Sequence, residues 1–369
     1  MDIIFHCDEL NERGTAIACY DYAYFNQKLL GNKSIIFYDK KLRNNVGILE
    51  KFQNQFTVIG YEDFEEIDKN ISNKYDLMYV IKGGNLDHLC SSHIPTMVHA
   101  VFPQSIFQIH GSSYAFISEW ISKKSLYIIP TVPHIVNIPL VSNRFNLRRE
   151  LCIPEKATVF GSYGGKNSFD IEFVKDVVIP FVLRNKNDVY FLFMNYEKFI
   201  DHPRAIFLPI SIKKEYKEKF VATTDAMLHA RYLGESFGLA CAEFSSKNKP
   251  IISYKLSKDK HHHYILSSNI LLYKNSSELI EILMNFNSKD HLDKDYKAYL
   301  QNYSPEIVMN LFEKHLIIPA IKNKNIKIQI NRKTLNARIT INKFFNLLSK
   351  LVLPFNKIKS LYLKQIGKF

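Results

Sequence analysis

The amino-acid sequence predicts an α/β protein made of two doubly wound domains that face each other across a cleft. Three observations support this expectation. The chain has 369 residues, which is more than a single hydrophobic core usually serves. Short apolar runs alternate with amphipathic segments, a pattern typical of parallel βαβ units. The pattern breaks near residues 140–156 and then starts again, so we expect a domain boundary there.

Apolar runs in the first half of the chain predict one parallel sheet. A glycine-containing loop at residues 8–16 should lead into a helix that ends near Leu30, and a second helix is expected over 119–124. Strands joined through helices make right-handed crossovers. The runs that we expect to form strands are 2–7, 34–39, 55–60, 75–82, 96–102, 113–118 and 125–130.

The second half repeats this architecture. Residues 158–165 are expected to form a strand followed by a glycine turn, and Ser304 followed by Pro305 is a good helix start. Further strands are expected over 189–194, 205–209, 225–230 and 250–254. Helices are expected over 168–183, 213–224, 235–247, 276–286, 291–303 and 304–316.

Composition indicates a globular protein of a reducing compartment. Hydrophobic residues make up 46% of the chain, with 27 Phe and 21 Tyr, which is enough for two cores. The five cysteines are scattered through apolar runs, so we expect buried thiols and no disulfides. We find neither a signal peptide nor an apolar run of about 18 residues, so the sequence predicts a cytoplasmic protein.

The positive charge lies at one end of the chain. The net charge of the chain is +13, and residues 320–369 contain twelve Lys or Arg but no Asp or Glu. A nearly neutral body argues against nucleic acid as a partner, whereas a basic tail favours an acidic surface such as a membrane. The tail also has an apolar stripe at helical spacing, formed by Ile341, Phe344, Phe345, Leu348, Leu351 and Val352.

This stripe predicts an in-plane helix that binds anionic lipid through residues 333–368, which would place the protein at the inner face of a membrane. The alternatives are that the stripe packs on the first domain or forms a dimer contact.

The segment "LGESFGLACAEF", residues 233–244, has two interpretations. One is a G-x-S-x-G nucleophile motif with Ser236 as the nucleophile of a serine hydrolase. That motif should follow its strand directly, but three residues separate Gly234 from the strand over 225–230. Its acid and histidine should also be well separated, whereas Asp259 and His261 lie almost next to each other. The sequence therefore favours the second interpretation, in which two carboxylates act.

In the second interpretation, residues 234–238 open a helix whose unpaired N–H groups attract phosphate. Glu243 lies two turns further on, where its carboxylate can accept hydrogen bonds from two neighbouring hydroxyls. A phosphate with a diol beside it describes a nucleotide sugar.

The stretch "HARYLGESFGLACAEFSSKNKPIISY", residues 229–254, resembles the E-x7-E segment of retaining GT-B glycosyltransferases, specifically the family 4-like enzymes. The resemblance extends loosely over residues 1–315 and implies two Rossmann-like domains facing across a cleft, followed here by a basic helical tail. It also implies a nucleoside diphosphate sugar as donor and a glycan or lipid-linked acceptor, with no metal and no other cofactor.

The resemblance also implies roles for residues of the second domain. Glu235 would contact the donor sugar hydroxyls and Glu243 the ribose. Arg231 and Ser236 would lie beside the donor, and the family's diphosphate contacts would come from the backbone amides of Phe237, Gly238 and Leu239.

The glycine turn "GSYGGK" matches the turn from which the family supplies an Arg and a Lys to the diphosphate. Gly164, Gly165 and Lys166 fit this pattern, but Ser162 stands where the Arg is expected. Arg231 is a candidate replacement, and reduced or absent activity is the other outcome that we consider.

In the first domain, the resemblance places Gly14 and Thr15 at the donor phosphates and the acceptor, and His99 near the donor sugar. A packed core histidine is an equally good interpretation of His99. Three consecutive histidines, His261, His262 and His263, point in different directions on any regular backbone, so we expect no metal site there.

We therefore expect an acceptor-side domain over residues 1–145, a donor-binding domain with a returning helix over 146–318, and a basic tail over 319–369. The expected function is retaining transfer of a sugar to a glycan acceptor, in surface polysaccharide or lipopolysaccharide synthesis. The alternatives are a degenerate GT-B protein that binds a glycan or partner without catalysis, a nucleotide-sugar epimerase and the serine hydrolase.

Overall fold

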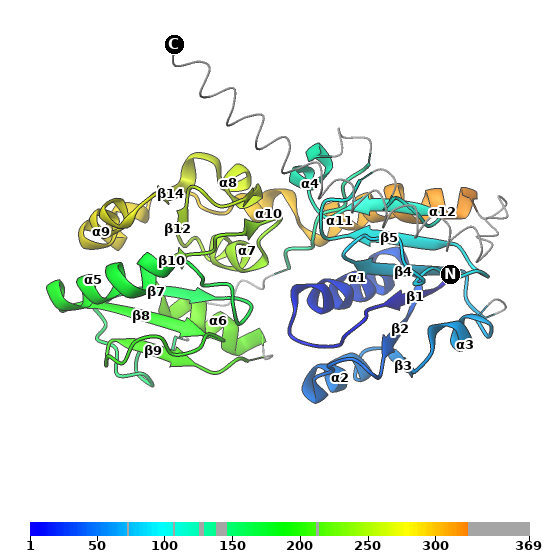
Figure 1. Ribbon diagram of the computed structural model, residues 1–369, viewed down its shortest axis with the longest axis horizontal. Helices are drawn as coiled ribbons and strands as arrows, with labels where there is room; N and C mark the ends of the chain where they lie inside the picture. The colour runs from blue at the N-terminus through cyan, green and yellow to red at the C-terminus, as the bar shows by residue number, and fades with distance from the viewer. Residues whose placement is uncertain (72–73, 106–107, 125–128, 138–145, 212–213, 324–369) are drawn as a thin grey trace, which may run out of the picture.

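The computed structural model describes residues 1–71, 74–105, 108–124, 129–137, 146–211 and 214–323. Within these ranges the chain forms two lobes, each built on a parallel six-stranded sheet (Figure 1). The tail over 324–369, including the apolar stripe and the predicted membrane contact, lies outside the described residues. None of the described helices combines the length and the hydropathy that a membrane span requires.

The first sheet has the strand order β3-β2-β1-β4-β5-β6, and every neighbouring pair is parallel. The strands are β1 (Asp2–His6), β2 (Lys33–Asp39), β3 (Thr57–Tyr61), β4 (Leu77–Lys82), β5 (Thr96–Ala100) and β6 (Ser113–Phe116). The helices that accompany it are α1 (Gly14–Leu30), α2 (Val46–Gln53), α3 (Phe64–Asp68) and α4 (Glu119–Lys124).

The second sheet has the order β14-β12-β10-β7-β8-β9, so its strands follow the same doubly wound sequence as those of the first. They are β7 (Thr158–Tyr163), β8 (Val189–Met194), β9 (Ala205–Leu208), β10 (Ala226–His229), β12 (Ile251–Tyr254) and β14 (Ile270–Tyr273). A separate two-stranded sheet pairs β11 (Gly234–Glu235) with β13 (Asp259–Lys260). In sheets of this kind, ligands bind where the strand order reverses, which here is between β7 and β10.

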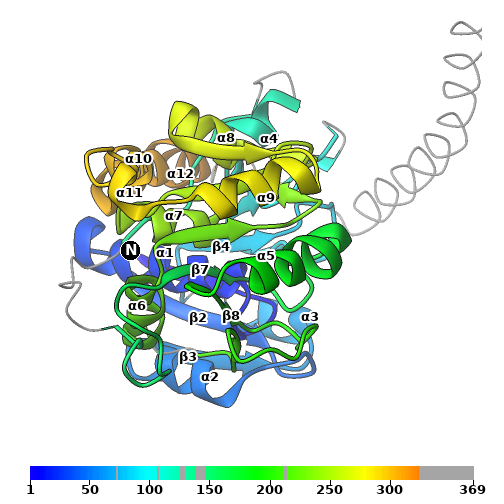
Figure 2. The same cartoon turned by 90° about the vertical axis from the view of Figure 1, so that its left-hand side faces the viewer.

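Helices flank the second sheet, and the last helices of the described chain follow them (Figure 2). A π-helical turn over Val174–Val178 leads into the first of them. They are α5 (Ile179–Asn185), α6 (Lys214–Thr223), α7 (Leu239–Ser246), α8 (His261–Leu266), α9 (Ser276–Asn285), α10 (Ala298–Asn302), α11 (Pro305–Phe312) and α12 (Ile318–Lys322).

Alternate strand residues are buried on opposite faces of the first sheet. On β1, Ile3 and Phe5 belong to the core that includes α1, whereas Ile4 packs in a second cluster with Met78 and Val80 of β4. Burial on both faces explains why these strands are continuous apolar runs rather than alternating ones.

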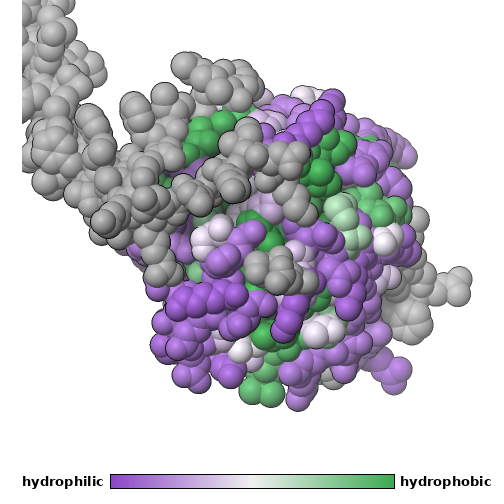
Figure 3. Space-filling view, turned by 90° about the vertical axis from the view of Figure 1, so that its right-hand side faces the viewer, coloured by the Kyte–Doolittle hydropathy of each residue, from purple (hydrophilic) through white to green (hydrophobic). Residues whose placement is uncertain are grey.

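Seen from the end formed by the first sheet, the surface that is not drawn in grey is largely hydrophilic, with smaller hydrophobic areas (Figure 3).

The C-terminal helices return from the second lobe to the first. The ring of Phe312 on α11 lies 5.1 Å from that of Tyr22 on α1 and 5.3 Å from that of Tyr79 on β4. The Ser113 hydroxyl donates a 2.8 Å hydrogen bond to the carbonyl of Leu316, just beyond α11. The last described helices therefore complete the core of the first lobe.

Two expectations about helices were wrong. The expected helix over 235–247 starts only at Leu239, because Gly234 and Gly238 have φ angles of 70° and 91°, which a right-handed helix does not allow. The preceding residues form β11 instead. The expected helix over 291–303 is confined to α10, after a 3-10 turn over Ser288–His291. The sequence pattern did not predict α2, α3, α8 or β14.

The expectation for the cysteines is confirmed in part. All five thiols are free, and Cys7, Cys19 and Cys241 are buried. Cys90 is half-buried and Cys152 is exposed, because Cys152 lies in a turn with a φ angle of 53° rather than in a strand or helix.

Replacing Phe312 by Ala should lower the free energy of unfolding by about 3–5 kcal/mol, because it removes a fully buried ring from the contact between α11 and the first lobe. Ile307→Ala is a matched control on the same helix. Because Ile307 is 42% exposed, this replacement should lower the free energy of unfolding by less than about 1 kcal/mol. Urea denaturation of both variants measures the difference. Equal costs would mean that α11 is not anchored through Phe312.

Candidate functional site

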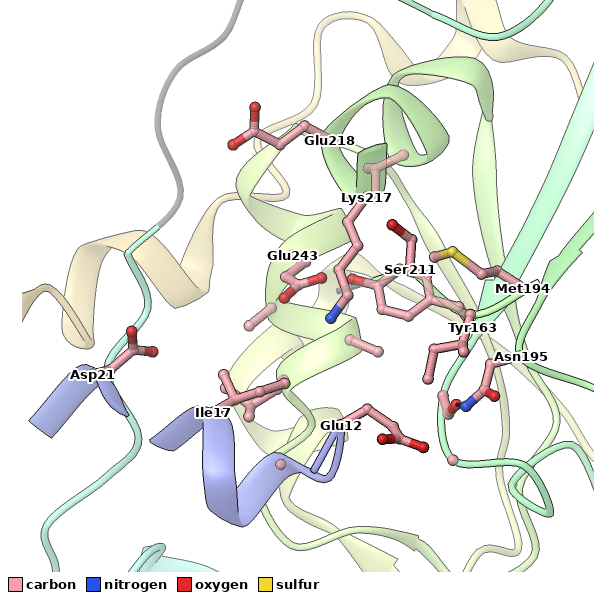
Figure 4. Close-up of a pocket in the computed structure, with 18 of the residues that line it drawn as sticks. Glu12, Ile17, Asp21, Tyr163, Met194, Asn195, Ser211, Lys217, Glu218 and Glu243 are labelled. Carbon is pink, nitrogen blue, oxygen red and sulfur yellow. Dashed lines mark hydrogen bonds between the residues drawn. The ribbon is translucent and has the colours of Figure 1, made fainter. Parts of the chain in front are cut away.

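A cavity of about 240 Å³ lies between the two lobes (Figure 4). It receives residues from α1 and the loop before it, from α2, from the segment that links the lobes, and from the carboxyl ends of β7 and β8. The second lobe also contributes α6 and α7. The lining includes Gly14, Asp21, Lys51, Tyr163, Gly164, Gly165, Asn195, Lys217, Leu239, Ala240 and Glu243.

Two helix N-termini meet at this cavity. Helix α1 starts at Gly14 and helix α7 at Leu239, and a Cβ built on Gly14 would lie 3.6 Å from Leu239 Cδ1. Neither N-cap makes a side-chain hydrogen bond, and neither first turn contains an acidic residue. Free N–H groups and the positive ends of two helix dipoles therefore point at one place, which favours an anionic ligand.

The glycine turn after β7 forms another wall of the cavity. Asn195 donates a 2.7 Å hydrogen bond through Nδ2 to the carbonyl of Gly164, which holds the turn in place. A Cβ on Gly165 would meet no atom within 4 Å, so open space borders the backbone there. A ligand can approach this backbone closely.

The cavity lining includes neither Lys166, which we expected to contact the diphosphate, nor Ser162, which stands where the family's Arg is expected. Ser162 is buried, and its hydroxyl lies 3.3 Å from that of Tyr196. The side chain of Lys166 is 65% exposed, and its ammonium pairs with the carboxylate of Glu197 at 2.7 Å. The glycines of the motif therefore line the cavity, but its lysine does not.

Glu243 lies in the second turn of α7 and faces the cavity (Figure 4). Its half-buried carboxyl group has no hydrogen-bond or ion-pair partner among the described residues. Burial, and secondarily the charge of Asp21, raise the pKa of Glu243 to about 8. Such a group can accept hydrogen bonds from hydroxyls of a ligand, and in its protonated form it can also donate one.

Glu235 lies next to the cavity lining rather than in it. Arg231 donates from Nη1 to Glu235 Oε1 at 2.8 Å, and His229 Nε2 lies 3.4 Å from the same oxygen. Burial alone would raise the pKa of Glu235, but the hydrogen bond from His229 and the charge of Arg231 outweigh it and hold the pKa below its usual range. The carboxylate is therefore ionised, and its orientation is fixed from two sides.

A serine and three histidines form a hydrogen-bonded group that reaches this carboxylate through His229. The Ser253 hydroxyl lies 3.0 Å from His229 Nδ1, 2.9 Å from His262 Nε2 and 3.3 Å from His263 Nε2. Burial lowers the pKa of His262 well below its usual value, and the neighbouring histidines add to this effect. Among the residues that the structure describes, no group of His, Cys, Asp and Glu side chains is arranged to hold a metal ion.

His99 is a buried residue of the first sheet, not a lining residue of the cavity. Its Nδ1 lies 2.8 Å from the Tyr79 hydroxyl and its Nε2 lies 2.7 Å from the carbonyl of Val132. Burial lowers the pKa of His99 to about 4. Both ring nitrogens are occupied within the core of the first lobe.

The remaining expected residues surround the start of α7. Phe237 is buried, and its carbonyl accepts a 2.6 Å hydrogen bond from Tyr299; Gly238 is the N-cap. The Ser236 hydroxyl has no hydrogen bond to a histidine among the described residues, so the geometry gives no support to a serine hydrolase. Of the residues expected from sequence, the cavity brings together Gly14, Gly164, Gly165, Leu239 and Glu243, and leaves Thr15, His99, Lys166, Arg231, Glu235, Ser236, Phe237 and Gly238 outside its lining.

Sequence reasoning missed several lining residues, above all Lys217 on α6 and Lys51 on α2. Lys217 lies within "KKEYKEKF", which resembles an ordinary solvated helix face. Its position after a strand of the second sheet was the available signal, because that edge of the sheet is where ligands bind.

No protein-family model matches the chain, and no curated protein matches it. Solved structures do match, over nearly their whole length. Anabaena HepE, solved with UDP-glucose, is 12% identical with a TM-score of 0.64, and the match covers 85% of this chain and 99% of HepE.

Two further solved structures match over the same shares, 85% of this chain and 99% of theirs. WaaG, a glycosyltransferase involved in lipopolysaccharide biosynthesis, is 8% identical with a TM-score of 0.60. A mutant of S. aureus TarM, solved with fondaparinux, α-GlcNAc-glycerol and UDP, is 9% identical with a TM-score of 0.61. These neighbours are GT-B glycosyltransferases, and the predicted GT-B fold is confirmed.

The raised pKa of Glu243 predicts a pH-dependent stability. The carboxyl stays protonated in the folded protein up to a pH near 8 but ionises near 4.5 when unfolded. Folding therefore takes up a proton between these values, and stability from this group is lost as pH rises through that window. Glu243→Gln should remove this loss. Relative to the wild type, the free energy of unfolding of the variant should therefore rise by on the order of 2 kcal/mol as the pH is raised from 5 to 8, allowing for partial exposure.

Chemical denaturation of both proteins across this pH range measures the difference in the free energy of unfolding. In an Asp21→Asn background the gain should be smaller, because the Asp21 charge is the second cause of the shift. A difference between variant and wild type that does not change with pH would contradict the assignment.

Proposed function

We propose that this protein is a retaining glycosyltransferase that transfers a sugar from a nucleoside diphosphate donor to a glycan acceptor. The observation that carries the proposal is the meeting of two uncapped helix N-termini at one cavity, with Glu243 in the second turn of α7. The helix ends suit the diphosphate, and the carboxyl group suits the ribose hydroxyls. The GT-B fold and neighbours solved with UDP or UDP-glucose support this choice of ligand.

In the proposed reaction, the bond between the sugar anomeric carbon and the donor phosphate breaks while the acceptor oxygen bonds to the same face of that carbon. The acceptor hydroxyl proton passes to an oxygen of the leaving phosphate. Glu235, ionised and held by Arg231 and His229, binds hydroxyls of the donor sugar. The amides at the start of α7 stabilise the negative charge that develops on the leaving group.

A role in surface polysaccharide or lipopolysaccharide synthesis is part of the proposal and is supported by the similarity to WaaG. Such acceptors are found at membranes, and the basic tail over 333–368 would place the enzyme there. We propose that the transfer needs no bound metal, since the helix ends and cationic side chains meet the charge of the diphosphate.

Binding of a nucleoside diphosphate tests the ligand class. Isothermal titration calorimetry with UDP, GDP and ADP should show that one of them binds, with its nucleoside binding at least about tenfold more weakly because it lacks the diphosphate. If none of the three bound, the chain would have the fold of these enzymes without their donor, which is the degenerate GT-B alternative.

Glu235→Ala should reduce sugar transfer at least about 100-fold while the protein stays folded, because the donor sugar loses its charged contact. Transfer from the accepted donor is followed by mass spectrometry of the product, and NMR of its anomeric proton reports whether configuration is retained. Glu281→Ala, an exposed glutamate on α9, is the control and should keep full activity. Unchanged turnover in Glu235→Ala would refute the assignment.

A further inference from the structure

The cavity needs a positive side chain that the glycine turn does not supply. A diphosphate leaving group carries more negative charge than the partial charges of helix ends balance, each being worth roughly half an elementary charge. Ser162 carries no charge, Lys166 is paired with Glu197 outside the lining, and the guanidinium of Arg231 is bonded to Glu235. None of these three positions therefore contributes a positive side chain to the cavity lining.

Lys217 on α6 lies where such a charge is needed. Its half-buried side chain lines the cavity, and Figure 4 shows its ammonium reaching into the space bordered by Tyr163 and Glu243. The nitrogen lies 5.8 Å from the centre of the Tyr163 ring. Tyr163 directly precedes Gly164 of the glycine turn, so the ammonium and the turn belong to the same wall of the cavity.

The ammonium of Lys217 lacks a compensating anion. Among the described residues it has no ion pair, since none of their carboxylates lies within 4 Å of it. Burial lowers the pKa of Lys217, and the charge of Lys51 on the opposite lobe lowers it further, against a smaller opposing effect of Asp21. A partly buried charge without a partner is unfavourable, and an anionic ligand between the two lobes would relieve it.

We propose that Lys217 is the side chain that binds the donor diphosphate and stabilises it as it leaves, in place of the cations expected after β7. This inference rests on the proposed function and names its phosphate-binding residue. Lys51, which faces Lys217 from the first lobe, adds to the positive potential that the bound diphosphate meets. Because the two lysines repel each other, bound phosphate also favours the approach of the two lobes.

Calorimetry on the full chain tests the assignment. UDP, GDP and ADP are each titrated beside the matching nucleoside, into wild type, Lys217→Met, Lys217→Arg and Lys166→Met. Lys217→Met should reduce the ratio of diphosphate affinity to nucleoside affinity by roughly tenfold or more. Lys217→Arg, which keeps the charge, should restore most of it, and Lys166→Met should stay within about twofold of the wild type.

The comparison with the nucleoside separates a phosphate contact from a structural effect, because a distorted pocket would weaken both ligands. The inference is overturned if Lys217→Met keeps the wild-type ratio, or if Lys166→Met loses it instead; the proposed function survives either result. Inorganic pyrophosphate is the remaining probe. If wild type binds it through Lys217 but binds no nucleotide, the anion site stands and the proposed function fails. If wild type binds neither, both fail.

Discussion

The structure depends on one electrostatic constraint, which is that two helices from different lobes direct their positive ends at the same cavity. Helices α1 and α7 both begin without a side-chain cap, and they start so close together that a Cβ at Gly14 would lie 3.6 Å from Leu239 Cδ1. Unpaired N–H groups that face each other are unfavourable unless water or a ligand satisfies them. An anion that bridges the two ends satisfies both, which connects ligand binding to the relative position of the lobes.

The fold holds these helix ends in place by two sets of contacts between the lobes. The C-terminal helices return to the first sheet, where Phe312 packs among the rings of Phe5, Tyr22 and Tyr79. In the second set, Trp120 of α4 donates a 2.8 Å hydrogen bond from Nε1 to Asp259, which pairs in register with Gly234 of β11. This second contact therefore lies next to Glu235, so the relative position of the lobes and the orientation of that carboxylate are connected.

Sequence patterns predicted the sheets well because strands buried on both faces are continuous apolar runs. They did not predict α2 and α3, which are short and begin at the Asn45 and Asp63 caps. The paired acids and the glycine turn were found from spacing, and Glu243 and the glycines do line the cavity. Which lysine faces the cavity could not be found in this way. That depends on how α6 lies against the end of β7, a tertiary arrangement that local spacing does not encode.

The central claim is that the cavity binds a diphosphate between the two helix ends. A crystal structure with the nucleoside diphosphate that the protein binds tests it most directly. The account predicts phosphate oxygens within hydrogen-bond distance of the backbone N–H groups at the start of α7 and of the Lys217 ammonium, with the ribose hydroxyls at Glu243. A diphosphate bound elsewhere, with no phosphate oxygen near these amides, would contradict it.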